Sequence, residues 1–144
     1  RRTTGQVYAF GVSAISQLEP GYFQNVKSVD DYTGLLTGGE LAVEKGRIVS
    51  EDEKIIREVI TQLMCNKYIN WNDMSNMLNI DLEKILSTVR IDSEELDKFS
   101  GDDLLEYSRD MLRVTEKGSM FIRNIAASLD PAFKAEENKY SKSV

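Results

Sequence analysis

The 144-residue sequence contains no histidine and a single cysteine, Cys65. Without histidine the chain has no imidazole to act as a general base or as a metal ligand. One thiol can build neither an internal disulfide nor a self-contained zinc or iron–sulfur site. A lone cysteine is typical of a protein from a reducing compartment, which predicts a cytoplasmic location. The mostly apolar, helical surroundings of Cys65 predict a buried, unreactive side chain.

Long hydrophobic runs and an excess of positive charge are also missing. No apolar stretch approaches the roughly 18–20 residues that a membrane-spanning helix needs, and the segment after Arg1 and Arg2 is polar, unlike a signal peptide. The 24 acidic residues outnumber the 18 basic residues, which gives a net charge of −6. Phosphate backbones attract cationic faces, so this balance argues against a protein that binds duplex nucleic acid. We therefore expect neither a membrane nor a nucleic acid as partner.

The first third of the sequence predicts one strand and one short helix. The run "QVYAFGV", residues 6–12, has the composition of a buried strand. Because a terminal strand needs neighbours to bury both of its faces, we expect the chain to be a fragment of a larger sheet. Residues 13–27 predict a loop that turns at Pro20-Gly21.

A helix is expected next. Ser28 is a candidate N-cap, and Gly38-Gly39 predicts the helix end. Tyr32, Leu35 and Leu36 would share one face of this helix. Residues 40–50 then predict a connector.

The remaining sequence predicts a mainly helical domain. Ser50 and Glu53 have the spacing of a capping box ahead of an amphipathic run. Shorter helical patterns follow over residues 69–80, 81–90 and 92–101. Two apolar runs around residues 108–110 predict a β-hairpin. Thr115 is a candidate cap for a closing helix that ends before Pro131, with five residues toward the core: Met120, Phe121, Ile125, Ala126 and Leu129.

Helices followed by a hairpin and a closing helix are typical of a winged-helix domain. Such domains often bind DNA, but the helices that would enter the groove carry Asp81, Glu83, Glu94 and Glu95, which repel phosphate. A winged helix that serves as a packing or lid module fits these acidic faces better. DNA binding stays open as a function that a salt-dependent mobility shift would detect.

Four separated blocks of the sequence, in order, resemble a known family. These blocks are "FGVSAIS", "GYFQNVKSVDDY", "SEDEKIIREVITQLMCN" and "LRVTEKGSMFIRNIAASLD". Together they are similar to the C-terminal third of oxygen-independent coproporphyrinogen III oxidase, a radical S-adenosylmethionine enzyme of haem synthesis. The resemblance implies an α+β fold with three parts. Residues 1–48 would be the terminal strand and helix of a partial α/β barrel, residues 49–130 a winged-helix-like domain, and residues 131–144 a polar tail.

The sequence departs from the family pattern in places. Ile56-Arg57 stands where the family has paired basic residues, and Ser119 stands where arginine is frequent. The family's cluster-binding C-x3-C-x2-C motif and its glycine-rich segment lie upstream and are absent from these 144 residues. The resemblance therefore implies S-adenosylmethionine and a four-iron, four-sulfur cluster in the intact enzyme. The fragment alone is expected to bind neither and to be inactive.

The resemblance also implies a cofactor contact near the start of the chain. In the family, "GVSAIS" lies beside the cofactor cavity, so Ile15 would contact a second S-adenosylmethionine, and Gly11, Ser13 and Ala14 would form part of the wall around it. The residue types are compatible, since glycine and alanine let a ligand approach the backbone. The alternative is that Val12 and Ile15 belong to the core and that Gly11 is a kink in a sheet.

The reaction that the resemblance implies is the oxidative decarboxylation of two propionates of coproporphyrinogen III to vinyl groups. Because the substrate is anionic, cationic clamps are expected. Arg123 is the best candidate, since it interrupts an apolar helix face; the others are Arg1, Arg2, Lys27 and Arg57. Tyr22, Gln24 and Asn25 would line the cavity from a loop. A salt-bridged arginine and an ordinary polar loop are the respective alternatives.

Residues 49–130 would then act as a lid that limits the access of solvent to the radical chemistry. The intact enzyme is expected to be a monomer that uses an unidentified electron acceptor. A haem chaperone of the same superfamily stays open as an alternative, although the absence of histidine disfavours axial haem ligation by these residues.

Overall fold

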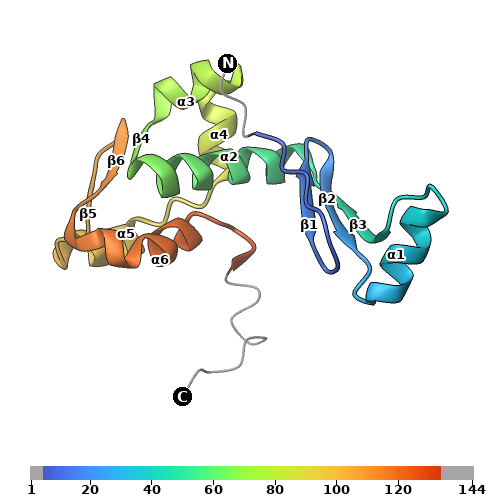
Figure 1. The fold of residues 1–144 in the computed structure, drawn as a ribbon. Coiled ribbons are helices and arrows are strands. Elements are labelled where there is room, and N and C mark those ends of the chain that lie inside the picture. Colours follow the sequence, from blue (N-terminus) through green and yellow to red (C-terminus); the bar gives the residue numbers. More distant parts are fainter. Residues whose placement is uncertain (1–4, 134–144) are drawn as a thin grey trace. The chain divides into compact units, whose positions relative to one another are not determined.

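The computed structural model describes residues 5–133, which divide between Glu51 and Asp52 into two compact units. We call them the N-terminal unit and the C-terminal unit (Figure 1). Each unit contains one small antiparallel sheet together with helices.

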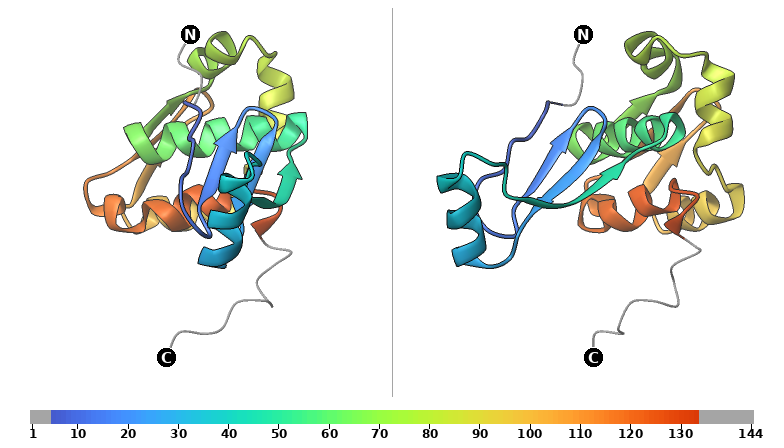
Figure 2. Two further views of the ribbon diagram at one scale, coloured as in Figure 1. Left: turned by 45° about the vertical axis from the view of Figure 1, so that its right-hand side comes forward. Right: turned by 90° about the vertical axis from the view of Figure 1, so that its right-hand side faces the viewer.

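The N-terminal unit consists of a three-stranded sheet and one helix (Figure 2). Its elements are β1 (Ile15–Leu18), β2 (Gly21–Asn25), α1 (Val29–Thr37) and β3 (Val43–Ile48). The strand order is β1-β2-β3, and both pairings are antiparallel. Leu18 pairs with Gly21, so only Glu19 and Pro20 connect the first two strands. Such a short connection is typical of a β-hairpin.

Three predictions for this unit are wrong. The expected strand over residues 6–12 is not formed: there, Val7 makes an isolated bridge with Gln17. The expected loop over 13–27 contains β1 and β2, and the expected connector over 40–50 contains β3. The turn at Pro20-Gly21 connects β1 to β2, and β3 contains Gly46 and the charged residues Glu44, Lys45 and Arg47. All six residues of β3 are exposed, and an exposed edge strand accommodates such residues.

The predicted helix of the N-terminal unit is confirmed as α1. The Ser28 Oγ accepts a hydrogen bond from the Asp31 backbone amide at 3.3 Å, which satisfies one of the free donors at the helix start. Gly38 caps the other end, and Gly39 follows with a φ of +80°. Glycine adopts this left-handed conformation without steric cost, so the chain leaves the helix there.

Few residues of the N-terminal unit are buried. Asn25, Ala42 and Val49 are the buried non-glycine residues among those described before Glu51. Many large apolar side chains of the same unit are exposed: Val7, Tyr8, Phe10, Val12, Ile15, Val29, Leu36, Leu41, Val43 and Ile48. The described part of this unit therefore encloses no hydrophobic core of its own.

The C-terminal unit has helices on a second three-stranded sheet. Its elements are α2 (Glu51–Asn66), β4 (Tyr68–Asn70), α3 (Trp71–Leu78), α4 (Leu82–Thr88), α5 (Ser93–Gly101), β5 (Leu105–Tyr107), β6 (Met111–Val114), the 3-10 helix η1 (Lys117–Phe121) and α6 (Ile122–Ser128). The predicted helices and the predicted β5–β6 hairpin are confirmed, but β4 was not predicted: its residues Ile69 and Asn70 were expected to begin the helix that α3 forms from Trp71. β4 pairs with the other edge of β6, which gives the strand order β4-β6-β5.

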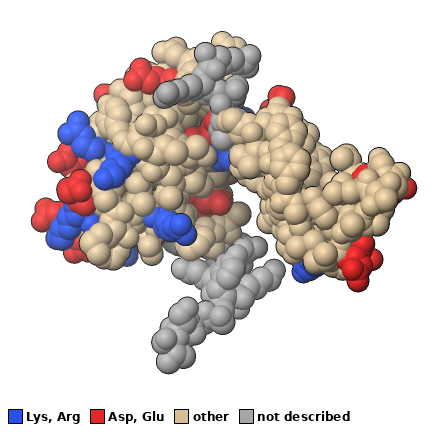
Figure 3. Space-filling model, in the orientation of Figure 1, with Lys and Arg blue, Asp and Glu red and all other residues tan. Residues whose placement is uncertain are grey.

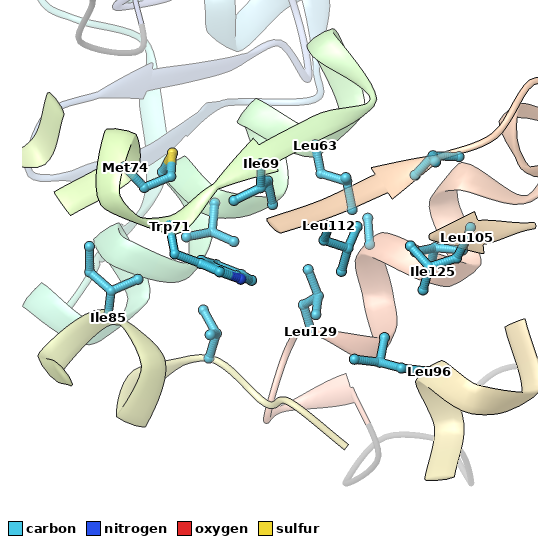
Figure 4. Packing of buried hydrophobic residues seen from close by; sticks show 14 of the residues in the cluster. Leu63, Ile69, Trp71, Met74, Ile85, Leu96, Leu105, Leu112, Ile125 and Leu129 are labelled. Carbon is cyan, nitrogen blue, oxygen red and sulfur yellow. The ribbon is translucent and has the colours of Figure 1, made fainter. Parts of the chain in front are cut away.

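The core of the C-terminal unit draws on nearly every one of its elements (Figure 4). α2 contributes Ile55, Val59 and Leu63, which recur every fourth residue and so lie on one face of the helix. Trp71 and the completely buried side chains of Ile85, Leu112 and Leu129 complete much of the cluster. This unit therefore has the closed apolar interior that a stable domain requires.

Two side-chain predictions for the C-terminal unit are wrong. Met120 and Phe121 are 88% and 45% exposed, whereas Ile125, Ala126 and Leu129 are buried as expected. Residues 117–121 form a 3-10 helix, so the helical periodicity that faces the core begins only at Ile122. Cys65 is exposed rather than buried, since it lies in the last turn of α2 away from the apolar face. The predicted tail, residues 131–144, falls mostly outside the described residues.

Candidate functional site

The segment from Phe10 to Ile15 forms a tight turn before β1. Gly11 has a φ of +100° and Ser13 a φ of +60°, both in the left-handed region. Glycine adopts such angles freely, but serine does so only at some energetic cost, so other contacts must hold the turn. The candidate cofactor residues Gly11, Ser13, Ala14 and Ile15 all lie in this turn or at its end.

The buried side chain of Asn25 supports the turn from inside. Its Nδ2 donates a hydrogen bond of 2.9 Å to the Gly11 carbonyl and one of 3.5 Å to the Ala9 carbonyl. The Asn25 backbone amide donates to the Ala14 carbonyl at 2.9 Å. One residue of β2 therefore contacts both ends of the turn, and Asn25 is only 8% exposed.

Three further groups fix the same turn. The Gly11 amide donates to the Tyr32 Oη at 2.9 Å, and the Ser13 amide donates to the Val26 carbonyl at 2.9 Å. The Gln24 Nε2 donates to the Ser13 carbonyl at 3.3 Å. Sequence reasoning missed the role of Tyr32, which it assigned to an apolar helix face. The position of Tyr32 one turn after the Ser28 cap does not by itself indicate a partner more than twenty residues upstream.

The outer side of the turn is open and carries small or apolar side chains. Val12, Ser13 and Ile15 are exposed, Ile15 by 54%, and an added Cβ at Gly11 would meet no atom within 4 Å. Apolar contact beside an accessible backbone suits a flat, partly apolar ligand such as an adenosyl group. The residues present therefore fit the contact that the sequence predicted for S-adenosylmethionine, and that contact stays a prediction.

The candidate substrate residues fall into two groups. Tyr22, Gln24 and Asn25 lie on β2, not in a loop, and Tyr22 pairs with Arg47 of β3. Tyr22 and Gln24 are half-buried. Arg123 belongs to α6 in the other unit, where it is exposed beside the exposed Asn124. It therefore does not interrupt the apolar face of its helix, which Ile125, Ala126 and Leu129 form.

The other candidate cations have different surroundings. Lys27 is exposed between β2 and α1. The Arg57 Nε lies 3.8 Å from the Glu58 Oε1 on α2, and both side chains are about 15% exposed. Arg1 and Arg2 lie outside the described residues.

Opposite charges alternate on the visible face of the C-terminal unit (Figure 3). Arg90 pairs with Asp92 at 2.5 Å and with Glu95 at 2.8 Å. Burial alone would lower the pKa of Arg90, but the hydrogen bonds and negative charges of Asp92 and Glu95 raise it, so the arginine stays charged. Lys84 likewise pairs with Asp52 at 2.6 Å.

Residues 5–133 contain neither a cluster of metal ligands nor a membrane-spanning helix. No group of three or more histidine, cysteine, aspartate or glutamate side chains in this range could hold a metal ion. Within the same range, no helix combines the length and hydropathy needed to cross a bilayer.

The chain is similar to coproporphyrinogen III oxidases. A solved structure of coproporphyrinogen III oxidase from Escherichia coli, a radical SAM enzyme, superposes with a TM-score of 0.72 at 27% identity over 88% of this chain. Among curated proteins, the oxygen-independent coproporphyrinogen III oxidase of Pseudomonas aeruginosa is 31% identical over 83% of the chain. The enzyme of the same name from Salmonella typhimurium is 30% identical over 92%.

These relatives are much longer than the chain. It spans 25% of the Pseudomonas protein, 29% of the Salmonella protein and 28% of the Escherichia coli chain. The family model for the HemN C-terminal domain matches residues 49–121, which run from the start of α2 to the end of η1. Because this match covers half of the sequence, the chain belongs to the HemN C-terminal domain family.

Proposed function

We propose that this chain is the C-terminal part of a radical S-adenosylmethionine enzyme that oxidatively decarboxylates two propionates of coproporphyrinogen III to vinyl groups. The observation that carries the proposal is the similarity over both units, since the structural match covers 88% of the chain and the family model covers only residues 49–121. If only the C-terminal domain occurred here, as part of another kind of protein, the similarity would not extend over the N-terminal unit as well.

The proposal assigns residues 1–48 to the end of the barrel domain. The exposed apolar side chains of the N-terminal unit support this assignment, because an apolar surface of this extent is stable in water only against another part of the protein. We assign the adenosyl contact to Ile15 and the surrounding wall to Gly11, Ser13 and Ala14. When bound, S-adenosylmethionine and the cluster supply the one-electron chemistry. The chain's own residues shape one wall and exclude water there.

The proposal assigns residues 49–130 to a winged-helix-like cover over the open side of the barrel. The closed core and the mixed surface charge of the C-terminal unit suit a packing role. Arg123, Tyr22 and Gln24 are the proposed substrate-side residues, with the exposed Arg123 guanidinium able to pair with a propionate carboxylate. The electron acceptor would come from outside these residues.

The test is anaerobic turnover by the complete protein that contains these 144 residues, with its cluster reconstituted. We expect S-adenosylmethionine cleavage coupled to the loss of carbon dioxide from coproporphyrinogen III. Removal of residues 49–130 should raise cofactor cleavage relative to product, since the cover would be lost. A complete protein that binds haem but neither cleaves the cofactor nor decarboxylates the porphyrinogen would overturn the proposal in favour of a chaperone.

A further inference from the structure

The inference concerns the side chains that hold the Gly11 turn, and it rests on the proposed function. We propose that Asn25 and Tyr32 are positioning residues for the cofactor wall: they fix the backbone of residues 11–14 so that Ile15 and the open face of the turn are presented to the adenosyl group. In this role neither side chain touches the ligand. This assignment differs from the earlier prediction that Asn25 contacts substrate.

Both backbone polar groups of Gly11 are hydrogen-bonded to side chains of other elements. Its carbonyl accepts from the Asn25 Nδ2 at 2.9 Å, and its amide donates to the Tyr32 Oη at 2.9 Å. Asn25 belongs to β2 and Tyr32 to α1, so the turn is held between a strand and a helix. A residue with a φ of +100° that is hydrogen-bonded in both directions has little freedom to change its conformation.

The other hydrogen bonds of the turn also point inward. The Ser13 amide bonds to the Val26 carbonyl, and the Ala14 carbonyl accepts from the Asn25 amide. The Ser13 carbonyl accepts from the Gln24 side chain. These backbone groups are thus occupied, whereas the side chains of Val12, Ser13 and Ile15 are exposed.

The chemistry of Asn25 suits this role better than direct substrate binding. At 8% exposure its amide nitrogen already donates to two carbonyls, Gly11 and Ala9. A carboxamide can donate in this way, whereas a carboxylate of the same shape only accepts and would repel both carbonyl oxygens. If the turn is already rigid in the free protein, less conformational entropy is lost when the ligand binds.

The experiment compares Tyr32→Phe and Asn25→Asp with a matched control, Tyr8→Phe. Tyr32→Phe removes the hydroxyl that accepts from Gly11 and keeps the ring. Tyr8 is exposed on the same unit, and its hydroxyl donates to Gln6, so its removal leaves the turn untouched. Because Asn25→Asp risks misfolding of the buried site, Tyr32→Phe is the decisive variant.

The first measurement is amide hydrogen exchange of Gly11 in the complete protein without bound S-adenosylmethionine. Loss of one hydrogen bond should speed exchange at Gly11 about three- to tenfold in Tyr32→Phe, with no change in Tyr8→Phe. Unchanged exchange at Gly11 would show that Tyr32 does not hold the turn and would overturn the inference.

The second measurement is the Kd for S-adenosylmethionine of the complete protein. We expect Tyr32→Phe to raise it about three- to tenfold, and Asn25→Asp by about tenfold or more. The thermal midpoint and the KM for the porphyrinogen should stay at wild-type values, which a general folding defect would not allow. A wild-type Kd in Tyr32→Phe, despite faster Gly11 exchange, would refute a positioning role. A wild-type protein that fails to bind S-adenosylmethionine would instead reject the proposed function.

Discussion

At the scale of single residues, the glycine at position 118 allows two backbone segments to come close together, because glycine has no Cβ. Gly118 is buried in η1, and a Cβ placed there would lie 1.9 Å from the Leu104 carbonyl oxygen and 2.8 Å from its carbonyl carbon. Both atoms belong to the backbone, so they cannot move aside as a flexible side chain could. The need for glycine at this position comes from the partner segment and not from the φ angle of Gly118 itself.

Gly118→Ala should lower the free energy of unfolding of the C-terminal unit by about 2–3 kcal/mol, because the added methyl group forces two backbone segments apart. Urea denaturation followed by tryptophan fluorescence measures this, since Trp71 lies in the core. Gly101→Ala is the matched control: a Cβ at Gly101 meets nothing within 4 Å, so its effect should stay within about 1 kcal/mol. Equal effects of the two substitutions would contradict the close approach at Gly118.

At the scale of elements, side-chain contacts join helices to the small sheet of the C-terminal unit. The Tyr107 hydroxyl on β5 donates a hydrogen bond to the Asp97 Oδ1 on α5. That hydrogen bond, with lesser contributions from burial and the charge of Asp97, raises the pKa of Tyr107. The protonated phenol is therefore favoured in the folded state.

This link predicts how stability changes at alkaline pH. When folding raises the pKa of a group, the group's contribution to stability is fully present at pH values below its pKa in the unfolded chain, which is about 10 for tyrosine. This contribution is lost as the pH rises through the pKa of the folded state. The free energy of unfolding should therefore fall more steeply above pH 10 in the wild type than in Tyr107→Phe. Urea titrations at pH values from about 8 to 11 measure the difference. Parallel curves for the two proteins would show that the hydrogen bond does not contribute.

The elements themselves differ in how far local sequence predicts them. α1 to α5 were expected from caps and apolar periodicity, because both signals lie within a few residues of one another. β1, β2 and β3 were not expected. Their polar and charged residues resemble a loop, and only pairing with a neighbouring strand makes them a sheet.

Across the whole molecule the two units differ in their interiors. The C-terminal unit has a cluster of buried apolar side chains that includes Val59, Leu63 and Ile69, each 0% exposed. In the described part of the N-terminal unit, Ala42 and Val49 are the buried apolar side chains apart from glycine. Since the burial of apolar surface is the main stabilising contribution to folding, the N-terminal unit is the less stable of the two.

Hydrogen exchange on the 144-residue chain should reveal this difference. Amides of β1 and β2 should exchange by openings of lower free energy than amides of α2 and β6, because few buried contacts oppose the opening. In the complete protein the β1 and β2 amides should become more protected, as the proposed barrel covers the apolar surface. Equal protection of both units in the isolated chain would contradict the difference in their cores.

The sequence alone determined most of the helical pattern of the C-terminal unit and the hairpin of β5 and β6, because each depends on residues close together in the chain. It also determined the resemblance to the family, because the order of the four blocks can be compared without knowing how they fold. The tertiary structure alone decided how Asn25 and Tyr32 hold Gly11, why Gly118 has no room for a side chain, and why Met120 and Phe121 face outward. These features depend on atoms that are brought together from distant positions or on a 3-10 helix that shifts the helical phase. Neither circumstance leaves a periodic signal in the sequence.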